Sequence, residues 1–247
     1  MREWIDQDRF ELVIQPVVDL KTGKIIGGEV LSRLNHPKRG ILSPSLFLPI
    51  INELNLYPQF DLYIFQKSCD WIAYMLTQEV ELQFLACNFS RKTLSEADIV
   101  PKIRNCADSL SLNHSQMAIE ITEQEDETDT DLFQANLKQL KEDGFQIFVD
   151  DFGAGVTSVK DLWHYPVDVV KIDRSILLAS NTPKGETAFR GLVKLAATLG
   201  AQVLCEGIET EDQHLLAKNC RCHYGQGYLF SPPITRDFFD ILKISDI

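Results

Sequence analysis

Acidic and amide side chains stand at the ends of several apolar runs in this sequence, and their types suit metal binding. The plainest case is VDDFGAG at 149–155, where Asp150 and Asp151 close an apolar run and glycines follow. Adjacent carboxylates repel each other and are costly to desolvate unless a cation lies between them. Other runs carry Glu29, Asn88, Glu120, Lys171 and Glu206, most of them near the C-terminal end of the run. Carboxylate and amide oxygens are hard ligands, so the set predicts a site for Mg²⁺ or Mn²⁺.

The aspartate pair raises a geometric question, because successive side chains of a strand point to opposite faces. Asp150 and Asp151 reach one centre only where the strand ends and the backbone turns, and Gly153 and Gly155 permit a turn. Two metals roughly 3.5–4 Å apart also need a bridging carboxylate with further ligands on each side. A second interpretation of the pair alone is that Asp151 caps a helix starting near Val156.

Seven short runs rich in apolar and β-branched residues predict the strands that carry these side chains. They are FELVIQPVVDL (10–20), KIIGGEVLSRL (24–34), LQFLACNFS (82–90), QMAIEIT (116–122), FQIFVDD (145–151), VDVVKID (167–173) and AQVLCEG (201–207). Helix-length segments lie between most of them, at 58–79, 99–110, 129–142 and 184–199. The first two runs are separated by the turn KTG, which predicts an antiparallel hairpin. Strand–helix alternation predicts a mostly parallel sheet, open or closed into a barrel, with the polar residues at its C-terminal end.

Length and composition are those of one globular domain. The chain has 247 residues, of which 45% are hydrophobic and 24% charged, and about 250 residues is typical of an α/β barrel. No repeat or linker is evident, so we expect a single domain over residues 1–247. The net charge of −12 argues against binding long nucleic acid, but not against a small anionic ligand beside a bound cation.

The cysteines and the hydropathy pattern bear on the compartment. No CxxC pair and no cluster with zinc spacing occurs among Cys69, Cys87, Cys106, Cys205, Cys220 and Cys222. Free thiols suit a reducing cytoplasm. The N-terminal MREWIDQDRF lacks the apolar segment of a signal peptide, and no stretch approaches the ~18 apolar residues of a membrane span. We therefore expect a cytoplasmic protein without membrane contact of its own.

Seven ordered segments, spread over nearly the whole chain, resemble the EAL-type cyclic di-GMP phosphodiesterases, a family of bacterial signalling domains. They are IQPVVDL, GGEVLSRL, ACNFS, IEITEQ, VDDFGAGVTSVKDLWHYPVDVVKID, CEGIETEDQ and QGYLFSPPI. The resemblance implies an α/β fold, a TIM-like (β/α)₈ barrel with an antiparallel first strand. It also implies metal-dependent hydrolysis of cyclic di-GMP to linear pGpG.

The resemblance implies a role for each matching residue. Two Mg²⁺ or Mn²⁺ ions would be held by Glu29, Asn88, Glu120, Asp150 and Asp151. The catalytic residues would be Glu206 as general base or water-positioning group, Lys171 as the group that orients the attacking water, and Glu123 as a brace for the loop after Asp151. Contacts with the substrate or its surroundings would come from Gln15, Leu31, Arg33, Asp173, Glu209, Gln226 and Pro233.

Simpler interpretations of single residues remain open beside these roles. Arg33 could form a surface ion pair, and Lys171 could pair with Asp173 alone. Glu209 could be an acid at a helix start, and Gln226 could belong to a plain turn.

The chain also departs from the family pattern. Val30 replaces the alanine of the signature, while Ala154 and Val156 remove a hydroxyl and an aromatic ring from the loop after Asp151. In the family this loop links the metal site, the substrate and a dimer interface, so these changes bear on turnover and on dimer coupling. A homodimer is expected, and a fused or associated sensory domain is possible in this family.

Three functions are weighed on this basis. The first is an active phosphodiesterase, which is favoured because every expected metal-ligand and base position is filled. The second is a degenerate EAL domain that binds cyclic di-GMP or a protein partner without hydrolysis. The third, an unrelated metal-dependent barrel enzyme, accounts for the acids at the strand ends but not for the ordered segments.

Overall fold

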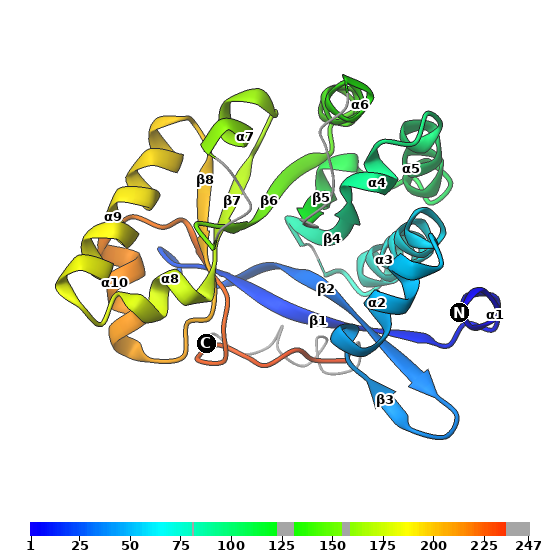
Figure 1. Ribbon diagram of the computed structural model, residues 1–247, viewed down its shortest axis with the longest axis horizontal. Helices are drawn as coiled ribbons and strands as arrows, with labels where there is room; N and C mark the ends of the chain where they lie inside the picture. The colour runs from blue at the N-terminus through cyan, green and yellow to red at the C-terminus, as the bar shows by residue number, and fades with distance from the viewer. Residues whose placement is uncertain (81, 123–130, 155–158, 236–247) are drawn as a thin grey trace.

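The strands of the protein close into a barrel in the computed structural model, which describes residues 1–80, 82–122, 131–154 and 159–235. In that part of the chain the strand order is β1-β9-β8-β7-β6-β5-β4-β2-β3, and β1 also pairs with β2 (Figure 1). The barrel strands are β1 (Phe10–Asp19), β2 (Ile25–His36), β4 (Phe84–Ser90), β5 (Met117–Thr122), β6 (Gln146–Phe152), β7 (Val169–Ile172), β8 (Gln202–Cys205) and β9 (Tyr224–Gly225). Strand β3 (Gly40–Leu42) extends the sheet outside the barrel. The expected TIM-like barrel is confirmed.

The antiparallel first strand is also confirmed. Strand β1 is antiparallel to both of its barrel neighbours, β2 and β9, whereas the other barrel pairs are parallel. The hairpin turn is held by Asp19, whose carboxylate accepts hydrogen bonds from the backbone N–H groups of Lys21 (2.9 Å) and Thr22 (2.7 Å). The register places Gln15 opposite Glu29, so two of the predicted site residues are cross-strand neighbours.

Helices surround the barrel, with α8 to α10 on one side and α2, α3 and α5 on the other (Figure 1). Their bounds are α1 (Arg2–Asp6), α2 (Pro44–Glu53), α3 (Tyr57–Thr77), α4 (Arg91–Leu94), α5 (Ile99–Asp108), α6 (Asp131–Glu142), α7 (Val159–His164), α8 (Arg174–Ala179), α9 (Pro183–Thr198) and α10 (Glu211–Asn219), with a 3₁₀ turn at His114–Gln116. The four expected helices correspond to α3, α5, α6 and α9. Within the described residues, none of the helices has the length and apolar character needed to cross a membrane.

The barrel interior holds one layer of apolar side chains, contributed by every barrel strand. This layer consists of Val17, Ile26, Phe84, Ala86, Ala118, Phe148, Val169, Leu204 and Tyr224. Larger apolar clusters pack the helices against the outside of the sheet. This apolar layer therefore fills one end of the barrel interior. The layer beside it is formed by other types of residue.

That next layer is where the polar residues lie. Strand side chains alternate with period two, so the residue two positions further along a strand shares its face. Ala118 is followed by Glu120 in this way, and Phe148 by Asp150. The same step leads to Asn88, Lys171, Glu206 and Gln226 from Ala86, Val169, Leu204 and Tyr224. The fold thus carries these side chains to one level, above the apolar layer.

Candidate active site

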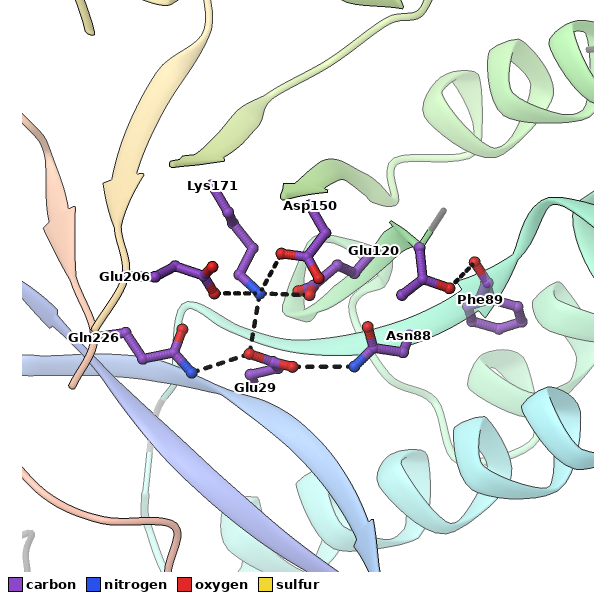
Figure 2. Close-up of polar contacts among 9 residues, drawn as sticks. Glu29, Asn88, Phe89, Glu120, Asp150, Lys171, Glu206 and Gln226 are labelled. Atoms are coloured by element: carbon purple, nitrogen blue, oxygen red, sulfur yellow. Dashed lines mark hydrogen bonds and ion pairs between the residues drawn. The ribbon is translucent and has the colours of Figure 1, made fainter. Parts of the chain in front are cut away.

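Lys171 lies at the centre of the polar layer, among carboxylates from different strands (Figure 2). Its Nζ is 3.0 Å from Glu29 Oε2, 2.5 Å from Glu120 Oε1, 3.0 Å from Asp150 Oδ1 and 2.9 Å from Glu206 Oε1. The lysine side chain is 1% exposed. A pairing of Lys171 with Asp173 alone is therefore wrong, because the ammonium contacts four other acids.

Glu29 connects the centre of the layer to the neighbouring amides. Asn88 Nδ2 donates to Glu29 Oε1 (3.1 Å), and Gln226 Nε2 donates to Glu29 Oε2 (3.0 Å). Gln226 is buried, so it is not a residue of an open turn. Gln15, opposite Glu29 in the hairpin, donates from Nε2 to the carbonyl oxygen of Ser231 (2.5 Å). The two hydrogen bonds from Asn88 and Gln226 fix the orientation of the Glu29 carboxylate.

Asp150 and Asp151 reach the site through an irregularity in β6 rather than through the end of the strand. The register between β6 and β7 shifts between Val149 and Phe152, and the strand continues to Phe152. Asp151 has a left-handed φ of 52°, which re-aims its side chain as a β-bulge does. Carboxylate oxygens of Asp150, Asp151 and Glu206 lie within 4.8 Å of one another. The sequence-based expectation of a terminal turn is thus corrected to a bulge inside the strand.

Burial and neighbouring charges shift the pKa values of four acids of the cluster, Glu29, Glu120, Asp151 and Glu206. Burial and the charge of Glu29 raise the pKa of Glu120 well above its usual range. Burial raises the pKa of Glu206 to about 8, and burial with the Asp150 charge raises the pKa of Asp151 to about 6. Burial would also raise the pKa of Glu29, but the charge of Lys171 and the amide hydrogen bonds hold it below its usual value. The negative charge of these acids therefore exceeds the single positive charge of Lys171.

The residues present fit a divalent cation. Glu120 is fully buried, and its Oε2 has no hydrogen-bond partner in the described part of the chain. An unpaired buried carboxylate oxygen is costly unless a cation meets it. The donors are carboxylate and amide oxygens, which Mg²⁺ and Mn²⁺ prefer. A metal would be held by Glu29, Asn88, Glu120, Asp150 and Asp151, and it would offset their excess negative charge.

Two cavities adjoin the cluster. The larger, of about 370 Å³, is lined on one side by Glu29 and Asn88 and elsewhere by groups that include Leu31, Tyr57, Phe60 and Asp61. The smaller, of about 230 Å³, is lined by residues that include Gln15, Arg174, Glu206, Glu209, Gln226 and Tyr228. The hydrogen bond from Gln226 to Glu29 joins the two linings. A ligand with two separated recognition groups would reach both cavities across the acidic cluster.

Comparison with known proteins agrees with this geometry. A sequence profile of the EAL domain matches residues 1–233. The chain belongs to the EAL domain family. An uncharacterized protein of Mycobacterium tuberculosis is 33% identical over 239 residues, which cover 95% of this chain and 38% of that protein. The cyclic di-GMP phosphodiesterase RocR of Pseudomonas aeruginosa is 32% identical over 244 residues, which cover 95% of this chain and 60% of RocR.

A solved EAL-type structure shares the whole fold. The PaMucR phosphodiesterase in complex with cyclic di-GMP superimposes with a TM-score of 0.88 at 29% identity, covering 96% of this chain and 97% of that one. Against the full-length relatives the match is partial, because this chain spans less than two thirds of the length of the M. tuberculosis protein and of RocR.

The EAL-family positions predicted from the sequence divide into a central and a peripheral group. The structure brings together Gln15, Glu29, Asn88, Glu120, Asp150, Asp151, Lys171, Glu206 and Gln226. Leu31 lines the larger cavity and Glu209 the smaller. Glu123, Gly155 and Val156 lie outside the described residues, so the interpretation of Asp151 as a cap for a helix near Val156 stays untested.

The remaining predicted positions lie at the edge of the site. Asp173 caps α8 by accepting from the backbone N–H of Ser175 (2.9 Å), and its charge contributes to the raised pKa of Asp151. Arg33 donates to the carbonyl oxygen of Ser32 (2.9 Å). Pro233 is half-buried. The substrate roles of these residues stay predictions.

Three residues of the site region were missed by sequence reasoning. Asp61, in α3, lines the larger cavity and accepts from the backbone N–H of Ser90 (3.0 Å), two residues after Asn88. An acid within an apolar helical stripe was the available signal. Arg174 and Tyr228 line the smaller cavity; Arg174 directly follows the quoted segment that ends at Asp173, and Tyr228 lies within the quoted segment QGYLFSPPI without having been singled out.

Proposed function

We propose that this EAL domain hydrolyses one phosphodiester bond of cyclic di-GMP and releases linear pGpG. The observation that carries the proposal is the oxygen-ligand cluster around Lys171, with an unpaired buried oxygen on Glu120 and a cavity on either side. The names of RocR and PaMucR refer to the same substrate and reaction class. The two cavities suit a ligand with two bases, and the acidic cluster between them suits a phosphodiester that arrives with divalent cations.

The catalytic roles are divided between a metal-binding group and a proton-transfer group. Two Mg²⁺ or Mn²⁺ ions held by Glu29, Asn88, Glu120, Asp150 and Asp151 would supply Lewis-acid stabilisation of the charge on the attacking and leaving oxygens. Glu206 accepts a proton from the attacking water at a carboxylate oxygen. Its pKa is about 8 in the metal-free site, and bound divalent cations would lower it toward the range of a base that is ionised at neutral pH. Lys171 Nζ orients the water and stays protonated, because its four acidic neighbours raise its pKa despite burial.

Atoms balance in the proposed step. The water oxygen forms a bond to phosphorus, and the bond from phosphorus to the ribose O3′ breaks. Glu206 releases the proton it has taken to solvent, and the leaving oxygen takes up a proton from solvent. Arg33 contacts a phosphate oxygen through its guanidinium. Gln15, Leu31, Asp173, Glu209, Gln226 and Pro233 position the dinucleotide or the groups beside it, and Glu123 braces the loop after Asp151.

We also propose an oligomeric state, a cellular compartment and a mode of control for this domain. The 247 residues act as a single cytoplasmic domain that forms a homodimer, and in a longer protein a sensory domain governs its activity. The cysteines of the chain are all free, as a reducing compartment requires. Light scattering of the purified protein with and without cyclic di-GMP would measure the oligomeric state.

The deciding experiment is chromatographic analysis of cyclic di-GMP incubated with the purified protein and Mg²⁺ or Mn²⁺, with EDTA as the control. Metal-dependent appearance of pGpG is the expected result. If cyclic di-GMP stays intact but binds measurably, the protein is a cyclic di-GMP receptor without hydrolytic activity and not an enzyme. Intact substrate without binding would overturn both and leave a protein-interaction role.

A further inference from the structure

An ion pair that the catalytic cluster does not use stands at the smaller cavity. Arg174 Nη2 lies 2.7 Å from Glu209 Oε1, and both residues line the cavity together with Glu206 and Gln226. The side chains are 53% and 36% exposed, so the pair adds little to folding stability. Its effect is instead to fix where one carboxylate points at the edge of a ligand cavity.

The chain holds both partners of this pair from several directions. Arg174 is the first residue of α8, directly after the capping residue Asp173. The stem of Arg174 packs over Gly207, where a Cβ would lie 2.3 Å from Arg174 Cγ, and Gly207 has a left-handed φ of 66°. The backbone N–H of Glu209 donates to Gln213 Oε1 (2.8 Å). Glycine at 207 therefore permits both the turn and the close approach of the arginine.

The free side of the carboxylate determines what it can recognise. Arg174 engages Oε1, and within the described residues Glu209 Oε2 takes part in no hydrogen bond or ion pair. An ionised carboxylate only accepts hydrogen bonds. The Watson–Crick edge of guanine offers adjacent N–H donors at N1 and N2, whereas adenine has an acceptor at N1. A fixed carboxylate therefore attracts guanine and leaves the adenine N1 lone pair facing a negative oxygen.

We propose that Arg174 is a positioning residue that holds Glu209 as the reader of one guanine base in the smaller cavity. The inference rests on the proposed function, because it takes cyclic di-GMP as the ligand. It assigns selectivity for guanine to a residue pair outside the metal cluster. Arg174 acts through Glu209 and not on the scissile bond, so its loss weakens recognition without slowing the chemical step.

The test compares Arg174→Met with Arg174→Lys and with a matched control. Arg190→Met is the control, because Arg190 Nη2 also lies 2.7 Å from a glutamate, Glu186, at similar exposure in α9 and outside the cavity lining. Dissociation constants for cyclic di-GMP and cyclic di-AMP are measured by calorimetry with Ca²⁺ present, and kcat and KM for cyclic di-GMP with Mg²⁺.

The expected result is a loss of selectivity in one variant. Arg174→Met raises the Kd and KM for cyclic di-GMP about tenfold, since one hydrogen bond to a charged group is misplaced. Its Kd for cyclic di-AMP and its kcat stay within about twofold of wild type. Arg174→Lys recovers part of the loss, and Arg190→Met binds both dinucleotides as wild type does.

Other outcomes separate this inference from the proposed function. Unchanged selectivity in Arg174→Met, with wild type still producing pGpG, overturns the inference and leaves the function standing. Selective binding that depends on Arg174, without pGpG from wild type, supports the inference and removes the hydrolysis. A wild-type protein that binds neither dinucleotide overturns both.

Discussion

The ammonium of Lys171 is surrounded by four carboxylates, of which those of Glu29 and Glu120 are buried and those of Asp150 and Glu206 are half-buried. Its pKa is raised by Asp150, Glu120 and the other acids although burial alone would lower it. One positive charge does not balance the acids of the cluster, which explains why burial raises the pKa of Glu206 and Asp151. The same imbalance makes divalent cations the natural complement of the site.

Replacing the proposed base tests its role directly. We expect Glu206→Gln to lower kcat by about 10²–10⁴-fold, because general-base catalysis contributes on that scale. The Kd for cyclic di-GMP with metal present should change little, since the amide keeps the shape of the side chain. Steady-state kinetics and calorimetry on the same preparation measure both quantities. Near-wild-type turnover would remove Glu206 from the mechanism.

The raised pKa values predict an unusual pH dependence for the metal-free protein. The pKa of Glu206 is about 8 in the folded state against 4.5 for an ordinary glutamate, and that of Asp151 is about 6 against 3.8. The folded state then binds more protons than the unfolded state, so the free energy of unfolding falls as pH rises from about 4.5 to about 8.

Thermal melts in EDTA between pH 5.5 and pH 8 check this direction. The Tm should fall over this interval, and it should fall less in Glu206→Gln, which has one such group fewer. A Tm that rises with pH over the same interval would show that these carboxyls are not proton-binding groups of the folded state.

At the element scale, the site depends on strands that place one apolar and one polar layer at matching levels. Glu29 enters this arrangement from β2, two residues after Gly27, which pairs with Phe84 in β4. A Cβ at Gly27 would lie 2.3 Å from the carbonyl oxygen of Phe84. Glycine at this position therefore lets β2 and β4 approach closely and close the barrel beside the site.

A methyl group added at Gly27, where β2 and β4 approach closely, is expected to destabilise the barrel. Gly27→Ala should lower the free energy of unfolding by about 2–3 kcal/mol, because backbone rather than a flexible side chain must move. Gly191→Ala is the matched control, since Gly191 lies in helix α9 with open space around it, and it should gain up to about 1 kcal/mol. Urea unfolding of the two variants measures the difference. Equal free energies of unfolding for Gly27→Ala and Gly191→Ala would mean that the backbones of β2 and β4 move apart at little cost.

At the scale of the whole molecule, the cluster joins strands from both sides of the barrel. Glu29 is on β2, Glu120 on β5 and Asp150 on β6, while Lys171 is on β7 and Glu206 directly follows β8. A cation bound here therefore links segments far apart in the sequence and binds the folded state alone. Binding of the cation therefore raises the free energy of unfolding of the whole barrel.

Metal addition should accordingly raise the melting temperature. At a Mn²⁺ or Mg²⁺ concentration of about 100 times Kd, the gain is about 2.7 kcal/mol, equivalent to a Tm rise of roughly 5–10 °C for a chain of this size. EDTA should reverse the shift. Glu120→Gln should show a smaller rise, and an equal rise in that variant would place the ions elsewhere on the acidic surface.

The sequence by itself determined the element types and the chemistry of the site. Apolar β-branched runs with helices between them predicted a mostly parallel sheet, because burial on both faces demands that pattern. The closed barrel was implied by the resemblance to the EAL family. The polar residues near the strand ends, such as Glu120 and Glu206, stood out against those runs. Strand β9 was not predicted, since its two residues, Tyr224 and Gly225, are too short to show a period.

Only the tertiary structure decided how those residues meet. The bulge that turns Asp150 and Asp151 toward one centre depends on the register between β6 and β7, which pattern alone does not give. The four contacts of Lys171 and the Arg174–Glu209 pair join residues on different elements. Such long-range contacts follow from how the strands close around the interior layer, and closure is a property of the whole chain.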